Sequence, residues 1–134
     1  MNQKISGLYK GVFFNPSESG MRRIELELRV DVDGAPSLNV VSGDFYEKTK
    51  NARKYLSSFR FEVMKKIEKR SDKIVLIGQK GKFSSNSSQF KDIRIGISSN
   101  SNPLKATFVG TSSSKSKIHC ICKHVSKYFR TVFL

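Results

Sequence analysis

Hydrophobic and polar side chains alternate without a break from Arg23 to Asp33. Every even position from Ile24 to Val32 is aliphatic, and every odd position of the run is charged. A period of two is typical of a β-strand, whose successive side chains point to opposite faces. The breaker residues 33–36 end the run, and a stretch rich in valine and aromatic residues then continues to Tyr46. The pattern predicts a long antiparallel hairpin over residues 22–46, and the other strands are expected to be arranged around it.

The return arm of this hairpin changes the phase of its pattern. Val40 and Val41 are adjacent apolar residues, and Gly43 follows them. An extra residue in a strand swaps its two faces, and glycine tolerates the backbone that such a β-bulge needs. We therefore expect a bulge near residues 41–43.

Several further stretches predict strands separated by polar loops. Residues 7–14 alternate loosely and precede a turn-rich segment, and residues 55–64 place Phe59, Phe61 and Val63 on one face. The run Ile74 to Ile77 does not alternate, which indicates a strand covered on both faces. Before it, the basic run 65–73 contains a predicted turn at Ser71-Asp72, and after it residues 78–82 are interpreted as a basic hairpin turn. Later strands with a period of two are expected at residues 93–97, 104–108 and 118–122.

The last residues fit two structures. Val125, Tyr128, Phe129 and Val132 have helical spacing, but they are also good strand formers, and we interpret them as a strand because all preceding elements are β. The chain stops inside this apolar pattern, so we expect it to be the N-terminal module of a longer protein. Residues 1–134 are predicted to form one all-β domain, a mostly antiparallel barrel or sandwich of about eight or nine strands.

The charge balance is strongly basic. The sequence has 25 lysine and arginine residues against 11 acidic residues, a formal net charge of +14. Such a field attracts nucleic acid, anionic membrane surfaces and acidic proteins, although a well-solvated basic surface gives the same composition. Tyr46 and Tyr55 flank the first of two basic groups, as stacking aromatics do in proteins that bind single strands. The candidate polyanion-binding residues are Lys48, Lys50, Arg53, Lys54, Lys65, Lys66, Lys69 and Arg70.

Targeting signals and structural cysteines are not evident. The N-terminus has no apolar core of the length that a signal peptide needs, and no stretch approaches the roughly 20 apolar residues of a membrane span. Cys120 and Cys122 are too close together to cross-link a fold, so no structural disulfide is expected. We expect no membrane span, a reducing compartment and a cytoplasmic location.

Two groups of residues invite a metal. Asp31, Asp33 and Asp44 suggest calcium, but the further oxygen ligands of an EF-hand loop do not follow. Cys120 and Cys122 would share one face of a strand with His124, at a spacing of roughly 6.6 Å between alternate residues. A structural zinc site needs four converging ligands. We interpret the cysteines as small buried hydrophobes and assign no metal and no cofactor.

Catalytic patterns are equally scarce. The only two histidines are His119 and His124, and no nucleophile elbow of the form G-x-S-x-G is present. Glu25 and Glu27 lie on the predicted solvent face, without the burial that raises the pKa of a general acid. The GQKGK segment at residues 78–82 lacks the spacing of a phosphate-binding loop. We predict that this chain is not an enzyme.

Two motifs resemble a known module. LRVDVDG (28–34) and VVSGDFY (40–46) resemble the N-terminal β-rich module of uncharacterised bacterial metallopeptidase-like proteins, and SKYFRTV (126–132) is similar to the segment that leads out of it. The longer members of that group carry a zinc-binding HExxH motif downstream. This sequence contains no HExxH, so no zinc ligand or protease residue can be transferred to it. The resemblance implies an accessory module rather than a catalytic one.

Three functions remain open from sequence alone. The first is a non-catalytic accessory or binding module of a larger, metallopeptidase-like protein, whose partner is another protein or the downstream domain of the same chain. The second is a basic β-barrel that binds nucleic acid or another polyanion, which steep salt dependence would reveal. The third is a barrel that holds a small ligand in an apolar cavity.

Overall fold

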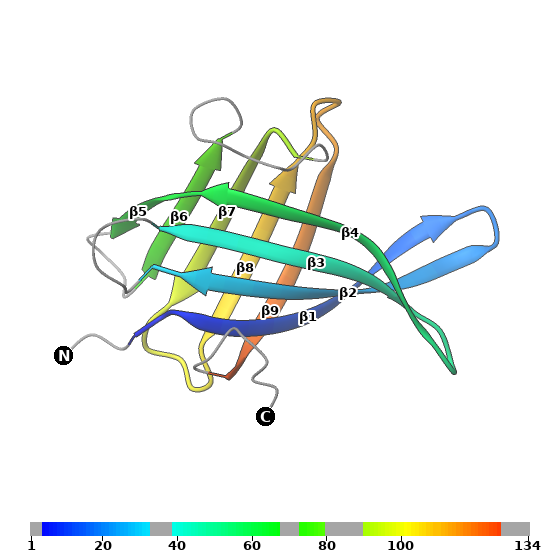
Figure 1. The fold of residues 1–134 in the computed structure, drawn as a ribbon, viewed down its shortest axis with the longest axis horizontal. Coiled ribbons are helices and arrows are strands. Elements are labelled where there is room, and N and C mark those ends of the chain that lie inside the picture. The colour runs from blue at the N-terminus through cyan, green and yellow to red at the C-terminus, as the bar shows by residue number, and fades with distance from the viewer. Residues whose placement is uncertain (1–3, 33–38, 68–72, 80–89, 127–134) are drawn as a thin grey trace.

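The computed structural model describes residues 4–32, 39–67, 73–79 and 90–126. These residues form one nine-stranded antiparallel sheet and contain no helix (Figure 1), which confirms the all-β prediction. The strands are β1 (Gly7–Ser17), β2 (Gly20–Asp31), β3 (Val40–Lys48), β4 (Arg53–Glu62), β5 (Met64–Ile67), β6 (Lys73–Gln79), β7 (Asp92–Ser98), β8 (Lys105–Thr111) and β9 (Lys117–Ser126).

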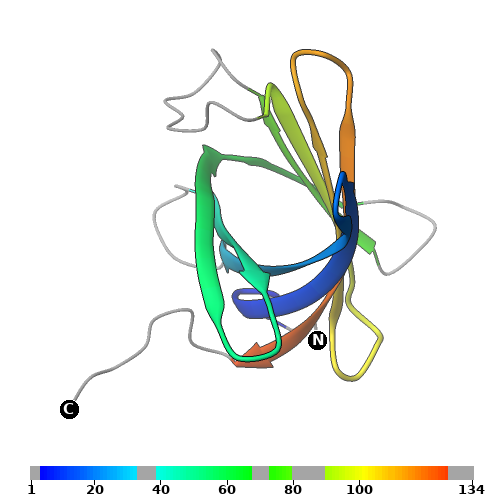
Figure 2. The ribbon, with the colours of Figure 1, turned by 90° about the vertical axis from the view of Figure 1, so that its right-hand side faces the viewer.

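The sheet curls like a barrel (Figure 2). Its strand order is β4-β3-β2-β1-β9-β8-β7-β6-β5, so β4 and β5 stand at opposite ends of the order. Only Val63 separates these two strands in sequence, and the chain therefore passes from one end of the sheet to the other through this residue. If β4 and β5 are counted as one bent strand, each strand lies beside the strand that precedes it in the sequence. The last strand, β9, then pairs with the first, β1. This is the connectivity of an up-and-down barrel.

The long hairpin forms as its alternation predicts. Ile24, Leu26, Leu28 and Val30 are buried on the inner face of β2, and the acidic residues between them point outward. The pairing of β2 with β3 runs without a shift from Ile24 opposite Glu47 to Asp31 opposite Val40.

The predicted bulge at residues 41–43 is therefore wrong. Val41 and Gly43 both lie on the inner face, and Val40 is a half-buried residue of the outer face, so no extra residue is needed. A register shift does occur in β3, but it lies between Phe45 and Tyr46, where this strand pairs with β4.

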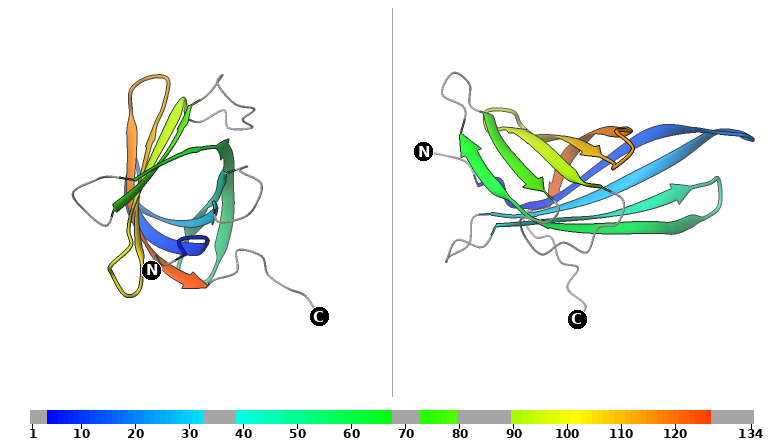
Figure 3. Two further views of the ribbon diagram at one scale, coloured as in Figure 1. Left: turned by 90° about the vertical axis from the view of Figure 1, so that its left-hand side faces the viewer. Right: turned by 90° about the horizontal axis from the view of Figure 1, so that it is seen from above.

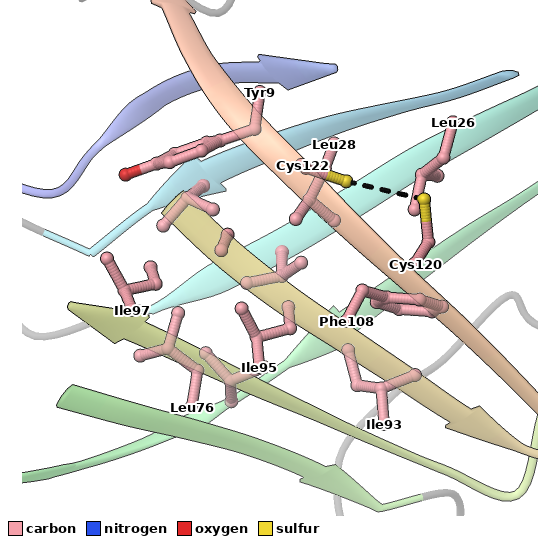
Figure 4. Packing of buried hydrophobic residues seen from close by; sticks show 14 of the residues in the cluster. Tyr9, Leu26, Leu28, Leu76, Ile93, Ile95, Ile97, Phe108, Cys120 and Cys122 are labelled. Atoms are coloured by element: carbon pink, nitrogen blue, oxygen red, sulfur yellow. Dashed lines mark hydrogen bonds between the residues drawn. The ribbon is translucent and has the colours of Figure 1, made fainter. Parts of the chain in front are cut away.

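Aromatic rings fill the interior. Phe45, Phe59, Phe90 and Phe108 contact one another at centroid distances of 5.2–6.3 Å. Isoleucines of β7 and leucines of β2 belong to the same core cluster, and Figure 4 shows them with Phe108. Such rings bury large apolar areas and contribute most of the driving force for folding.

The other predicted strands form with shifted ends. β1 extends to Ser17, so only Glu18 and Ser19 form the turn. Val75 on the outer face of β6 is 1% exposed, which confirms that this strand is covered on both faces. The first part of the basic run 65–73 belongs to strand β5. The predicted terminal strand beyond Ser126 lies outside the described residues.

Candidate functional site

Two hairpins, β1–β2 and β3–β4, extend past the body of the sheet on the same side (Figures 1 and 3). β1 pairs with β9 only from Leu8 to Gly11. Beyond that point the two strands diverge. Among the described residues, the second half of β1 has only β2 beside it, and residues 117–121 of β9 have only β8.

Gly11 allows β1 and β9 to meet where this divergence begins. A Cβ atom at this position would lie 2.8 Å from the Sγ atoms of both Cys120 and Cys122, and it would also strike the Ile121 carbonyl oxygen. Any side chain here would push the two strands apart. Glycine therefore fixes the point at which the opening between them starts.

A pocket lies on the inner side of the opening. Its volume is about 210 Å³, and its lining includes Phe13 from β1, Ile118 from β9, Phe45 from β3 and Leu56 from β4. Pockets for drug-sized ligands usually measure roughly 300–1,000 Å³, so this one suits a single side chain or a very small molecule. The aromatic rings of the core lie in the interior behind it.

An ion pair stands at the rim of this pocket. The Nε atom of Arg22 donates to Oε2 of Glu47 at 3.1 Å, and one terminal nitrogen donates to Oε1 at 3.0 Å. These hydrogen bonds and the charge attraction hold the pKa of Glu47 below its usual range and raise the pKa of Arg22. The arginine already has an anionic partner, so the pocket does not present an unpaired cation.

Exposed apolar side chains gather on the outer face near the opening. Strand register places these side chains on the outer side of β1, β2 and β9. Gly11 and Cys122 are the last opposed pair of β1 and β9, and Val12 and Ile121 are the next residue of each strand toward the opening. Their exposed fractions range from 38% to 64%. Clustered exposure of this kind is typical of interaction surfaces. We call these residues the apolar stripe: Val12, Phe14, Met21, Ile121 and Val125.

A row of lysines crosses the apolar stripe. Lys10 of β1 lies opposite Lys123 of β9, which in turn lies opposite Lys105 of β8. Like charges directly opposite each other in a sheet are destabilising. Lys10 has Glu27 at 3.8 Å, whereas Lys105 and Lys123 make no ion pair in the part of the chain that the structure describes. We call these three residues the lysine row.

Two of the predicted polyanion-binding residues, Lys48 and Arg53, take part in an ion-pair network. Arg53 hydrogen-bonds Glu25 and Glu27, at 2.7 Å and 2.5 Å for its closest contacts, and Lys48 lies 3.6 Å from Glu25. In the same network Arg29 pairs with Asp44 at 2.6 Å. Tyr46 packs against both Tyr55 and Arg53, so it is not an open stacking platform.

The remaining predicted residues that the structure describes lie at two places. Lys50 and Lys54 are exposed around the β3–β4 turn, whereas Lys65 and Lys66 are exposed on β5. Twelve residues of extended chain separate Arg53 from Lys65, which corresponds to roughly 40 Å. Lys69 and Arg70 lie outside the described residues. The structure therefore separates the two basic groups that the sequence suggested.

The cysteines lie in the core. Cys120 and Cys122 are 2% and 0% exposed, and their Sγ atoms are 3.8 Å apart (Figure 4). The hydrogen bond from Cys122 to Cys120, together with burial, raises the pKa of Cys122, and the same bond lowers the pKa of Cys120. The two thiols lie closer together than the roughly 6.6 Å between alternate residues of a strand. Both side chains point toward Gly11, which has no side chain to keep them apart.

The histidines of this segment separate. His119 points outward, whereas the His124 ring lies 4.8 Å from the Tyr9 ring, with its Nε2 atom buried and without a hydrogen-bond partner in the described part of the chain. No group of three or more His, Cys, Asp or Glu side chains is placed to hold a metal ion among these residues. Asp44 of the calcium hypothesis pairs with Arg29, and Asp33 lies outside the described ranges.

Sequence reasoning missed the apolar stripe and the lysine row. One signal was present, because Val12, Phe13 and Phe14 are consecutive and a strand with three consecutive apolar residues is apolar on both faces. The lysine row depends on which strands become neighbours and in what register. Residues 10, 105 and 123 are far apart in sequence, so no local pattern reveals that they meet.

No protein-family model, curated protein or solved structure matches this chain. The resemblance to the metallopeptidase-like module therefore rests on its motifs, of which the described parts lie on the paired strands β2 and β3. Across the described ranges, no helix has the length and apolarity needed to cross a membrane.

Proposed function

We propose that this domain is a non-catalytic binding module of a larger protein. Its partner is a protein, or a downstream domain of the same chain, that covers the outer face of β1, β2 and β9. The observation that carries the proposal is the apolar stripe, whose members Phe14 and Ile121 are 61% and 57% exposed on one side of the molecule.

The energetics favour a protein surface as the partner. Complete burial of a large apolar side chain contributes roughly 1.5–3 kcal/mol, so a few members of the apolar stripe suffice for a specific interface. Interfaces concentrate their binding energy in a few buried anchors surrounded by a polar rim. Phe14 has the chemistry of such an anchor, and the lysine row supplies a cationic rim.

Nucleic acid is a weaker alternative on the same observations. Sequence-tolerant binding of single strands combines cations with stacked aromatic rings. Beside the lysine row, Ile121 and Val125 offer aliphatic groups rather than aromatic rings. Arg53, which lies over the Tyr46 ring, already binds the carboxylates of Glu25 and Glu27. A partner with acidic residues around an apolar centre matches this outer face better.

Photocross-linking tests the proposal. A benzoylphenylalanine at position 14 is expected to cross-link a defined partner in cells that express the protein, whereas the same probe at position 66, on the outer face of β5, is the matched control. The identified partner is then purified and titrated against the wild-type protein and against the variants Phe14→Ser and Ile121→Ser. We expect each substitution to weaken binding at least tenfold without lowering the melting temperature.

The control position decides the outcome. Equal cross-linking at positions 14 and 66, or unchanged affinity of both variants for the purified partner, would overturn the proposal.

A further inference from the structure

The edge of β1 beyond Gly11 has unpaired backbone groups. Ser17 and Gly20 close a two-residue hairpin, and opposed residues in an antiparallel ladder alternate between hydrogen-bonded and non-hydrogen-bonded pairs. Counting back from this closing pair, the backbone N–H and C=O groups of Val12 and Phe14 point away from β2. The Gly11–Cys122 bridge uses the N–H of Val12 for the carbonyl oxygen of Ile121. Among the described residues, the groups without a strand partner are therefore the C=O of Val12 and the N–H and C=O of Phe14.

Pro16 occupies the next position of the same kind. Its missing N–H would also point away from β2, and this is where proline is tolerated in an edge strand. Proline at an edge opposes uncontrolled strand pairing. The tip of the hairpin is therefore protected, whereas nearer the body of the protein the C=O of Val12 and the N–H and C=O of Phe14 remain available.

From this geometry we infer that an extended segment of the partner adds as a strand to the edge of β1 at Val12–Phe14. The segment enters the opening between β1 and β9, and its side chains alternate between apolar and acidic. This inference rests on the proposed function, because it assigns a recognition mode to the same surface. Such strand addition is a common mode of peptide recognition.

The pocket is the reason why we expect apolar side chains in the added segment. A strand added to β1 lies about 4.8 Å from it, and every second side chain points to the inner face. On that face the opening is lined by Phe13 and Ile118, which also line the pocket. A volume of about 210 Å³ accepts one apolar side chain, which matches one anchor residue.

Positive charge around the opening is the reason why we expect acidic side chains in the added segment. The alternate residues of an added strand point outward, where Arg23, Lys117 and Lys123 border the opening. Glu25, opposite Val12, lies on the same outer face, and it is already bound by Arg53 and Lys48. Carboxylates at the outward positions of the partner therefore meet a cationic border, and charge complementarity of this kind selects partners and speeds association.

A synthetic peptide tests the inference. The probe is a fluorescein-labelled nine-residue peptide of alternating glutamate and leucine, titrated against the full chain by anisotropy at low and near-physiological salt. Its controls are a peptide of alternating lysine and leucine and a scrambled peptide of the same composition as the probe. We expect the alternating acidic peptide to bind, the two controls to bind at least tenfold more weakly, and the affinity to fall with salt.

Two variants separate the backbone from the side chain. Phe14→Ala and Phe14→Pro both remove the ring, but only the proline removes the outward N–H. Because this N–H is outside the β1–β2 ladder, we expect Phe14→Pro to keep the fold and to bind about five-fold more weakly than Phe14→Ala. Amide hydrogen exchange gives a second readout, in which bound peptide slows exchange at Phe14 of the wild-type protein.

The outcomes distinguish the two proposals. Equal affinity of the alanine and proline variants, or unchanged exchange at Phe14, would overturn strand addition and leave the apolar stripe as the binding surface. Equal binding of the acidic and lysine peptides would overturn the acidic specificity. Unchanged affinity of Phe14→Ser and Ile121→Ser for the cross-linked partner would instead remove the proposed function itself.

Discussion

The guanidinium group of Arg53 lies 3.6 Å from the centre of the Tyr46 ring. The same group binds the carboxylates of Glu25 and Glu27, so one cation of β4 reaches across β3 to two acidic residues of β2. Burial opposes the charged form of Arg53, but the hydrogen bonds to the two glutamates outweigh it and raise the pKa of the arginine. Part of the basic character of this protein is therefore used to hold its own sheet together.

Replacing this arginine is expected to destabilise the fold. Arg53→Met keeps the apolar stem but leaves Glu25 and Glu27 without their shared cation and removes the contact with Tyr46. We expect a loss of about 1 kcal/mol in the free energy of unfolding, since exposed ion pairs and cation–π contacts each contribute a fraction of that amount. Urea unfolding measures the change, and Lys50→Met in the exposed turn is the control. Equal stability of the two variants would contradict a structural role of the network.

The Arg22–Glu47 pair predicts a dependence on pH. Because Arg22 lowers the pKa of Glu47 in the folded protein, folding favours the ionised carboxylate. The stability from this pair is fully present above the pKa of an unfolded glutamate, and it is lost as the pH falls through the lower folded value. Urea unfolding between neutral pH and about pH 3 should therefore show a smaller loss of stability for Glu47→Gln than for the wild-type protein.

The matched control for this pair is Glu18→Gln in the β1–β2 turn. Glu18 is exposed and has no ion pair in the described ranges. We expect this variant to lose stability as steeply as the wild-type protein. A Glu47→Gln variant with the same slope would show that the rim pair does not contribute to the acid sensitivity of the fold.

Glycine positions in the sheet differ in how much they tolerate a side chain. A Cβ at Gly43 would lie 2.5 Å from the Phe59 ring, which is packed among the other rings of the core, whereas a Cβ at Gly96 would meet only the flexible side chain of Lys73. We expect Gly43→Ala to lower the free energy of unfolding by about 1–3 kcal/mol through overpacking. Gly96→Ala is expected to be nearly neutral, because Lys73 can move into solvent. Similar losses in both variants would contradict this account.

The sequence predicted the elements of the fold better than its surfaces. The alternation in β2 identified both the strand and its buried face, because the period of two depends only on local backbone geometry. The alternation in β3 predicted the wrong change of face, because Val40 and Val41 are adjacent apolar residues although their side chains belong to opposite faces of the strand. The surfaces require long-range pairing. The positions of Lys10, Lys105 and Lys123 became adjacent only when β9 paired with both β1 and β8.

The separation of the basic groups makes a prediction about nucleic acid. Lys50 and Lys54 lie near one end of β4, and Lys65 and Lys66 lie beyond its other end, so one phosphate-binding track would have to run the length of β4 to use all four. We expect single-stranded DNA to bind only at low salt, and neither Lys50→Glu/Lys54→Glu nor Lys65→Glu/Lys66→Glu to change anisotropy near physiological salt. Binding that persists at this salt concentration and is lost in one of the double variants would instead identify that group as a polyanion site, and the function of the domain would have to be assigned to nucleic acid.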